Sequence, residues 1–442
     1  MEDFIQGRNQ LLFTYGATCS GKTFTIQGNT ESPGILPRAL DVLFNTISDK
    51  LTRAPEKIIH NDSINREVYL RPVGFSGVAV CKQADIERIE NSKKEVVNLG
   101  KELCAVSNAS FFSSSGLSQD SLNSHTSDSS LQSLVTMFPM LKNRAKDSQV
   151  VNSIRIADCS DIQYSVWISF AEIYNENIYD MLEKMPEVKR KGEKPRRVPL
   201  KLSEDRDGGV YIKGLKEIQV TSSDEAYQLL MIGRENLHFA ATRLNHQSSR
   251  SHCIFNIKII KIPSDKIYKD QPHMARISML SFCDLAGSER IKKTLNSGER
   301  QKEAGNINTS LLVLGRVIKA IRQNQTTKDP KRHQVVPYRD SKLTRLFQSY
   351  FTGRGKASMV STTMTIFPKF SKIRIIKNPK NKVEFGFVLC FRWSISVNRH
   401  TFLMSLYKSL SFLQSRQKSV LKYIRNQKSP RRSKKDHIQS LI

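Results

Sequence analysis

One stretch of this sequence constrains its fold more than any other: Gly16, Ala17, Thr18, Cys19, Ser20, Gly21, Lys22 and Thr23. It matches the phosphate-binding loop pattern G-x-x-x-x-G-K-[ST] at every fixed position. In such a loop the glycines let backbone N–H groups converge on an anion, the lysine approaches the β- and γ-phosphates, and the threonine hydroxyl can ligate Mg²⁺. The apolar run 11–15 is typical of a buried strand, and residues 24–27 can continue as a helix. The stretch predicts a site for a nucleoside triphosphate with Mg²⁺; a chance glycine-rich turn is the competing interpretation.

The charge of the chain favours an acidic partner. The 442 residues carry a formal net charge of +29. Residues 361–442 hold 18 Lys and Arg against 2 Asp and Glu, whereas residues 1–360 hold 52 against 39. A surface this basic suits nucleic acid, an anionic membrane or an acidic protein polymer. Charge alone leaves all three open.

Cysteine spacing and hydropathy narrow the class of protein. The seven cysteines lie far apart and never form C-x-x-C, which argues against a disulfide framework or a zinc site and fits a reducing compartment. The chain opens with acidic residues and has no apolar signal segment. No apolar run approaches the roughly 18 residues that a membrane span needs. We therefore expect no secretion signal and no membrane insertion.

The first half of the chain contains one helical pattern and one long biased segment. Pro37 suits the first position of a helix after Gly34, and apolar residues recur at helical spacing up to Ile47. Residues from about 50 to 160 differ, since 12 of the 27 residues 107–133 are Ser and few are apolar. This composition predicts a long, largely disordered surface insertion.

The second half contains several predicted strands. The run 164–170 is strongly β-prone and leads toward a short predicted helix near 178–182. Four further strands are expected at 210–212, 217–220, 254–262 and 277–283. Residues 222–225 have the spacing of a capping box for the helix that follows.

Three polar segments after the phosphate loop carry further chemistry. Residues 245–252 are richer in hydroxyls and charge than a turn needs, although turn chemistry is the simpler interpretation. Asp284 directly follows an apolar strand, as a carboxylate presented to Mg²⁺ does, and Gly287 allows close approach to a terminal phosphate. Residues 303–310 begin a helix whose apolar positions then step by four and three.

Together these segments resemble a kinesin motor domain over roughly residues 3–50 and 160–360. The phosphate loop is similar to the family's G-x-T-x-S-G-K-T, residues 245–252 to its switch I motif N-x-x-S-S-R-S-H, and residues 284–289 to its switch II motif D-L-A-G-S-E. Other segments resemble the mitotic subfamily of the central spindle and cytokinesis, the sixth kinesin class: 34–38, the insertion before Trp167, 305–310 and 351–356. The resemblance implies an α/β P-loop NTPase fold of three layers, with a mixed central sheet and helices on both faces.

The resemblance also implies roles in holding nucleotide and metal. Lys22 and Thr23 would hold the phosphates and Mg²⁺. Ser249 would reach the metal or the γ-phosphate, and Asp284 would hold the metal through water. The cofactors implied are ATP and Mg²⁺.

The catalytic roles implied fall on the two switch segments. Gly287 would sense the γ-phosphate through its backbone N–H. Arg250 and Glu289 would close as an ion pair over the phosphate and position the attacking water. Such phosphoryl transfer depends on placement and electrostatics more than on covalent chemistry.

The partner implied is the microtubule, because tubulin has an acidic surface. The residues that would meet it are Lys328, Lys331, Arg332, Arg339, Lys342 and Arg345. The last three are spaced by three, which predicts one helix face, with Leu343, Leu346 and Phe347 on another. A merely solvated charged face is the alternative. The expected location is the cytoplasm and the spindle microtubules, with the nucleus as a second possibility.

The chain departs from the family pattern at both ends. Only 15 residues precede the phosphate loop, without the family's R-x-R-P segment, and the sequence after residue 360 diverges. We therefore expect a motor domain over 1–360 that is incomplete at both ends, with one side of the 11–15 strand unpaired, followed by a basic tail over 361–442. The run 428–435 suits nuclear import or polyanion binding, and a charged read-through tail fits equally well. No coiled-coil heptads are visible, so dimerisation has no evident basis.

The function favoured by the sequence is an ATP-dependent microtubule motor. One alternative is a non-motor microtubule-binding or regulatory fragment without ATP turnover, which the departures at the ends favour. Another is a P-loop protein that binds nucleic acid through the tail. The two switch motifs argue against nucleic acid.

Overall fold

The computed structural model describes residues 1–29, 32–52, 69–115, 153–154, 162–184, 186, 197–244, 250–263, 275–288, 299–327, 329–362 and 391–394. Its helices are α1 (Glu2–Ile5), α2 (Lys22–Gln27), α3 (Ile35–Ile47), α4 (Gln83–Ser115), α6 (Ser223–Leu244), α7 (Glu299–Thr326) and α8 (Lys342–Phe351), with the 3₁₀ turns η1 (Ser48–Lys50), η8 (Pro330–Arg332) and η9 (Tyr338–Asp340). Its strands are β1 (Asn9–Tyr15), β2 (Leu70–Val73), β3 (Gly77–Val80), β4 (Ile162–Tyr174), β5 (Asn177–Asp180), β6 (Lys201–Glu204), β7 (Val210–Lys213), β8 (Ile218–Val220), β9 (His252–Pro263), β10 (Arg276–Asp284), β11 (Gly355–Ser361) and β12 (Phe391–Ser394).

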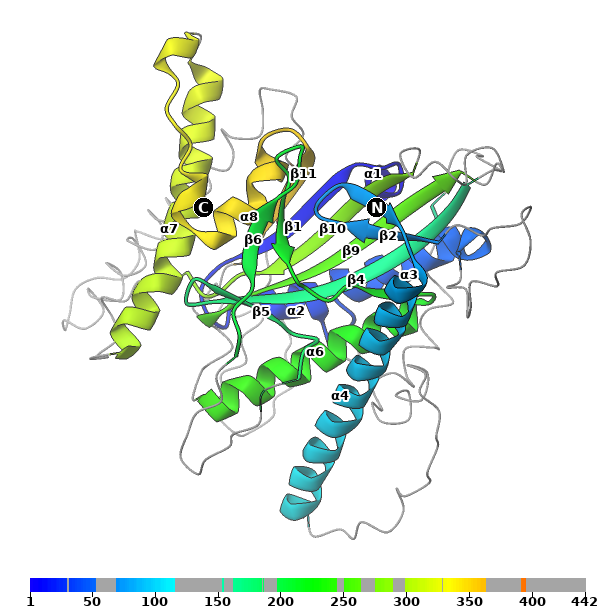
Figure 1. Ribbon diagram of the computed structural model, residues 1–442. Helices are drawn as coiled ribbons and strands as arrows, with labels where there is room; N and C mark the ends of the chain where they lie inside the picture. Colours follow the sequence, from blue (N-terminus) through cyan, green and yellow to red (C-terminus); the bar gives the residue numbers. More distant parts are fainter. Residues whose placement is uncertain are drawn as a thin grey trace, which may run out of the picture.

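A mixed central sheet forms the middle layer (Figure 1). Its strand order is β12-β11-β1-β10-β9-β4-β5, and β8 pairs with β4 beside this path. β1 is parallel to both β10 and β11, whereas β9 is antiparallel to β10 and β4. The long strands β4 and β9 are almost wholly buried, because helices or a hairpin cover both faces of the sheet. The predicted three-layer α/β fold is confirmed.

Two apolar cores lie on opposite faces of the sheet. One joins α2, α3, α6 and the middle of α4 to side chains such as Phe170, Phe255 and Phe282. The other joins α7, α8 and the hairpin β6–β7 to the alternate residues of the same strands, including Ile254 and Cys283. This alternation follows from the two-residue repeat of a strand. It places α2, which follows the phosphate loop, and α7 on different faces of one sheet.

β1 has partners on both sides. It pairs with β10 on one side, and seven residues of β11 pair with it on the other, from Asn9 opposite Gly355 to Tyr15 opposite Ser361. The expectation of an unpaired side was therefore wrong. The reason is that the run 355–361 itself returns beside β1 after α8, so the backbone groups of the phosphate-loop strand are satisfied.

Within the segment 50–160, residues 70–115 form two strands and a helix, which corrects the expectation of a largely disordered insertion for this part. β2 and β3 form a hairpin, and Tyr69 packs against Trp167 with ring centroids 6.3 Å apart and the rings tilted by 42°. α4 buries Val96 and Val97 in the core shared with α6, and Figure 1 shows it crossing α6. The serine-rich stretch dominated the prediction, although residues 69–103 contain enough apolar side chains to pack. The other residues of this segment, apart from 51–52 and 153–154, lie outside the described part of the chain.

Three predicted elements differ locally from the structure. The helix expected near 178–182 is replaced by β5, because Asn175 and Glu176 both have positive φ, 51° and 56°, and form a two-residue hairpin turn. α3 begins at Ile35, so Pro37 is its third residue and still lies in the first turn, where a missing N–H is tolerated. α7 begins at Glu299, before the predicted start. The strands at 210–212, 217–220, 254–262 and 277–283 are confirmed, with small shifts in their ends.

Among the helices that the structure describes, none combines the length and the apolar content needed to cross a bilayer. The basic tail, apart from the backbone of β12, lies outside the described residues.

Candidate functional site

The phosphate loop lies between the end of β1 and the start of α2. Cys19 has a φ of 62° and Gly21 a φ of 89°, so the backbone turns back on itself twice within three residues. Gly21 precedes α2 without any side-chain cap on the first turn of that helix. Alternating turns of this kind direct successive N–H groups toward one point, which is how such loops bind anions. The predicted loop conformation is thus present in residues 16–23.

The side chain of Lys22 is held inside the loop. Its ammonium donates to the carbonyl oxygens of Gly16, at 3.1 Å, and Ala17, at 2.7 Å. The residue is only 8% exposed. A positive charge that is buried in this way favours a negatively charged ligand, because the low dielectric of the surroundings strengthens the attraction.

Asp284 stands beside the loop, as the sequence predicts. It ends β10 in register with Thr14 of β1. Thr23 donates its hydroxyl to Asp284 Oδ2 at 2.5 Å, and Thr14 donates to Oδ1 at 3.2 Å. Burial raises the pKa of Asp284, against the Thr23 hydrogen bond and the Lys22 charge, which both lower it. The parallel pairing of β1 and β10 is what brings a carboxylate 261 residues from Thr23 into contact with it.

These oxygens fit Mg²⁺ and a bound phosphate. Carboxylate and hydroxyl oxygens are hard ligands, and Mg²⁺ in nucleotide sites takes only one or two protein carboxylates, its other ligands being phosphate and water. The threonine and the carboxylate converge directly beside Lys22. The residues present therefore suit the implied pair of ATP and Mg²⁺.

The backbone after Asp284 is fixed on both sides of Gly287. Ser288 N–H donates to the carbonyl of Gly16 at 3.0 Å, which ties this segment to the phosphate loop. Ala286 N–H donates to His252 Nδ1 at 3.0 Å. Gly287 itself is buried between these two anchors. A shift of this glycine would therefore be felt by both the loop and His252.

The end of β11 closes the other side of the loop. Thr362 N–H donates to the carbonyl of Tyr15 at 2.9 Å, and its hydroxyl lies 2.7 Å from that of Ser20. A Cβ on Gly16 would come within 2.3 Å of the Thr362 carbonyl oxygen. The first glycine of the loop is thus required by close packing as well as by turn geometry.

The structure does not describe several of the predicted site residues. Ser249, Glu289 and Lys328 lie outside the described residues. Arg250 is half-buried and stands two residues before β9. The structure thus unites the loop 16–23 with Asp284 and Gly287, whereas the expected Arg250–Glu289 ion pair stays a prediction.

The predicted microtubule face is split between elements. Lys331 and Arg332 lie exposed in η8, and Arg339 lies exposed in η9. Lys342 and Arg345 lie on α8, so the expected single helix face was wrong. The reason is Ser341, whose extended backbone and hydroxyl cap α8 and separate it from η9. The apolar face is confirmed, since Leu343 and Phe347 are buried and Leu346 packs beside them.

The two α8 residues of that face have partners elsewhere in the chain. Arg345 lies 3.0 Å from Glu204 of β6. The backbone N–H of Lys342 donates to Glu176 Oε2 at 2.7 Å. These contacts attach α8 to the sheet and to the β6–β7 hairpin; only the Arg345 contact engages the charged group itself.

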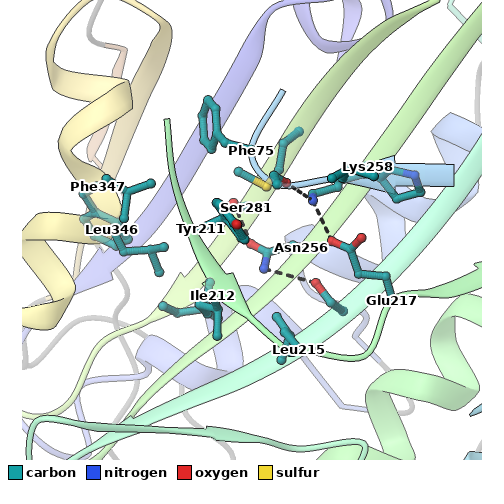
Figure 2. Close-up of a pocket in the computed structure, with 18 of the residues that line it drawn as sticks. Phe75, Tyr211, Ile212, Leu215, Glu217, Asn256, Lys258, Ser281, Leu346 and Phe347 are labelled. Carbon is teal, nitrogen blue, oxygen red and sulfur yellow. Dashed lines mark hydrogen bonds and ion pairs between the residues drawn. The ribbon is translucent and has the colours of Figure 1, made fainter. Parts of the chain in front are cut away.

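A separate cavity of about 820 Å³, its open mouth included, lies over the α8 face of the sheet. Figure 2 shows its polar floor, where Ser281 bonds Asn256, and Lys258 pairs with Glu217 at 2.5 Å. Apolar side chains such as Tyr211 and Phe347 form the walls. None of the phosphate-loop residues lines this cavity, so it is distinct from the candidate nucleotide site.

Sequence reasoning missed three residues of the site: Thr14, His252 and Ser310. His252 Nε2 lies 2.8 Å from the Ser310 hydroxyl. The strand pattern carried a signal for Thr14, a polar residue within an apolar run. His252 stood at the end of a quoted motif, but nothing in the sequence paired it with a serine 58 residues away.

Comparisons with known proteins agree with this geometry. The model of the kinesin motor domain matches residues 1–373. The chain is similar to the kinesin-like protein KIF20A of Homo sapiens, at 40% identity over 364 residues, covering 81% of this chain and 38% of that protein. It is also similar to KIF23 of Mus musculus, at 35% identity with 81% and 33% covered, and to subito of Drosophila melanogaster, at 36% identity with 79% and 46% covered.

A solved structure described as "kinesin 6" is similar in fold, with a TM-score of 0.54 and 29% identity. The alignment covers 81% of this chain and 77% of that one. This chain spans less than half the length of these curated relatives.

Proposed function

This chain belongs to the kinesin motor domain family, and we propose that it is an ATP-driven motor on microtubules. It binds ATP with Mg²⁺ at residues 16–23, hydrolyses the γ-phosphate and couples this reaction to microtubule binding. One observation carries the proposal: Asp284 accepts the Thr23 hydroxyl at 2.5 Å beside the buried Lys22. This contact joins the phosphate loop to the carboxylate that a nucleotide hydrolase needs.

Each residue of the candidate site has a task in this proposal. Lys22 and the loop backbone bind the phosphates, while Thr23 and Asp284 hold Mg²⁺, which neutralises charge on the phosphate oxygens. Ser249 contributes a further oxygen. The backbone of Gly287 responds to the terminal phosphate, and Arg250 with Glu289 orients the attacking water.

The proposed partner is the acidic surface of the microtubule. The exposed cations Lys331, Arg332 and Arg339 support it, because their charge suits such a surface. The location proposed is the cytoplasm and the spindle, in mitosis and cytokinesis, since the sequence resembles the sixth kinesin class.

A non-motor microtubule-binding fragment is the rival function. It would keep the cationic face without turning over ATP. The pairing of β1 on both sides favours the motor, because a phosphate loop that hangs from a fully paired strand is held in a defined position.

Calorimetry with Lys22→Ala tests the proposal. We expect the wild-type chain to bind ATP in the presence of Mg²⁺, and the variant to bind about 10- to 100-fold more weakly, the loss expected for one charge-assisted contact. Lys356→Ala is the matched control, since Lys356 is a half-buried lysine paired with Asp3 at 2.7 Å, at the far end of β11. Equal binding by wild type and Lys22→Ala would remove the loop as the site. Binding without phosphate release on microtubules would support the rival.

A further inference from the structure

A buried row of polar side chains crosses the sheet at the floor of the cavity drawn in Figure 2. Ser169 of β4 lies in register with Asn256 of β9, and Asn256 lies in register with Ser281 of β10. Lys258 follows two residues after Asn256, so its side chain leaves the same face of the strand. All four residues are at most 8% exposed. The surrounding side chains form an apolar core, so burial of this polar row has an energetic cost that hydrogen bonds must offset.

Hydrogen bonds within the row use all but one of the donors of Asn256. The Ser281 hydroxyl donates to Asn256 Oδ1 at 2.7 Å. Since Ser281 has only one hydroxyl hydrogen, the Tyr350 hydroxyl, 2.8 Å away, donates to Ser281. Asn256 Nδ2 donates to Ser169 Oγ at 3.3 Å. An amide nitrogen carries two hydrogens, so one N–H of Asn256 has no acceptor among the residues that the structure describes.

Lys258 leaves a second donor unused. Its Nζ donates to the carbonyl of Gly74 at 2.7 Å and to Glu217 Oε1 at 2.5 Å. An ammonium group carries three hydrogens, so the third has no acceptor within the described part of the chain. Asn256 and Lys258 both line the cavity, and Figure 2 shows the two side chains near one another on its floor. The floor therefore presents two N–H donors to an occupant of the cavity.

Charge at the cavity is balanced within the chain. Glu217 neutralises Lys258, and Arg71, which also lines the cavity, pairs with Asp85 at 3.4 Å. An anionic ligand would have to compete with these two carboxylates for their cations. A neutral acceptor needs no such exchange of partners, so the two donors suit a carbonyl oxygen better than a phosphate or a carboxylate.

The walls of the cavity are apolar and partly aromatic. Phe75 comes from the turn between β2 and β3, Tyr211 from β7, and Phe347 from α8. Aromatic walls favour a flat aromatic ligand, because such rings pack against one another over a large area. The volume of about 820 Å³, which includes the open mouth, lies within the range of about 300–1,000 Å³ that is usual for sites of small molecules.

We propose that this cavity is a binding site for a neutral, flat aromatic molecule whose carbonyl oxygen accepts hydrogen bonds from Asn256 and Lys258. The apolar body of the molecule packs against the aromatic walls and contacts both α8 and β7. The proposal does not depend on nucleotide binding, since no residue of the phosphate loop lines the cavity. A purely structural polar network, whose two remaining donors bond to water, is the competing interpretation.

A matched pair of probes separates these two interpretations. 9-Fluorenone and fluorene share a flat aromatic skeleton, and only fluorenone carries a carbonyl oxygen. Ligand-observed NMR with the full chain gives the dissociation constant of each probe. We expect fluorenone to bind at least about fivefold more tightly than fluorene, which is the discrimination that one neutral hydrogen bond provides. Fluorenone should also slow hydrogen exchange in residues 210–217 and 342–351, because both segments line the cavity.

Substitutions on the floor and the walls locate the bound probe. Asn256→Asp keeps an acceptor for Ser281 but removes the amide donors, so it should lose the preference for fluorenone over fluorene. Leu346→Trp fills the cavity from α8 and should weaken binding of both probes at least about tenfold, because the added ring overlaps the ligand. Leu215→Trp fills the cavity from the segment after β7 and serves the same test if Leu346→Trp does not fold. Leu237→Trp is the matched control, because Leu237 is a partly buried helical leucine that packs on the core of the opposite face.

Several results would overturn the proposal. Equal affinities for the two probes in the wild-type chain, or no binding of either, would show that the floor donors select no ligand. A preference for fluorenone that survives Asn256→Asp would contradict the assigned donor. Undiminished binding to a cavity-filled variant that folds, as its thermal midpoint shows, would place the probe elsewhere. Displacement of fluorenone by ATP with Mg²⁺ would place it in the phosphate loop.

Discussion

Asp180 shows how strongly burial acts on a single carboxyl group in this molecule. The residue ends β5 at 5% exposure. Its Oδ1 accepts the N–H of Leu182, and its Oδ2 accepts the N–H of Lys216, each at 2.8 Å. Burial raises the pKa of Asp180 to about 6, although both N–H bonds oppose the shift. Ionisation of this carboxyl group is therefore less favourable in the folded protein than in the unfolded chain.

This pKa predicts a pH dependence of stability. The folded chain keeps the Asp180 proton up to about pH 6, whereas the unfolded chain releases it near 3.8, so stability falls as pH rises between these values. The asparagine in the Asp180→Asn variant does not titrate, so the stability of this variant does not fall for this reason as the pH rises. We expect the destabilisation that it causes to be about 2 kcal/mol greater near pH 4.5 than near pH 7.5. Urea unfolding at both pH values measures this, with the exposed Asp207→Asn as control. A difference that does not change with pH would contradict the raised pKa.

Residues of the nucleotide site could be predicted from the sequence where they lie in a short motif. Lys22, Thr23 and Asp284 were found because each lies in a short motif whose chemistry depends on its neighbours in sequence. The contact between His252 and Ser310 was not, because it depends on where α7 lies against the sheet. The partner of Arg345 was missed for the same reason, since Glu204 is 141 residues away.

At the scale of elements, the strands with strong apolar runs were predictable and the insertion was not. β4 and β9 are rich in β-branched and aromatic residues, and β10 contains five apolar residues in nine, so each pattern favours a strand. The sequence predicts a helix where β5 lies, because four residues are too few to show a hydrophobic period and glutamate at position 176 is not typical of a turn with positive φ. α4 was missed because its apolar residues are sparse, and those that are buried pack against residues distant in sequence, including those of α6.

Substitutions in α4 test whether it belongs to the core. Val96 and Val97 are 0% and 1% exposed. Replacing either with Ala removes two methyl groups and should lower the free energy of unfolding by about 2 kcal/mol. Asn98→Ala, at an exposed neighbouring position, should change it by less than about 0.5 kcal/mol. Urea denaturation measures both. Equal stabilities for the Val97 and Asn98 variants would show that α4 does not pack on the core.

At the scale of the whole molecule, positive charge remains in large excess over negative charge. The chain carries a formal net charge of +29, and most of its described ion pairs are partly exposed. Exposed pairs contribute little to stability. The excess positive charge therefore acts mainly on binding partners. Either the net charge alone attracts any acidic polymer, or one surface of the chain binds the microtubule specifically.

Reversal of charge at two separate places answers this. Arg332 and Arg339 are exposed on η8 and η9, on the proposed microtubule face, whereas Arg88 and Lys94 are exposed on α4. Each double change to Glu alters the net charge equally. We expect Arg332→Glu with Arg339→Glu to weaken co-sedimentation with microtubules about tenfold, and the α4 pair to weaken it less than twofold. Wild-type binding should weaken with salt, because exposed charges are screened over about 8 Å at physiological ionic strength. Equal losses from both pairs would mean that net charge alone drives binding, and unchanged pelleting of the first pair would remove η8 and η9 from the interface.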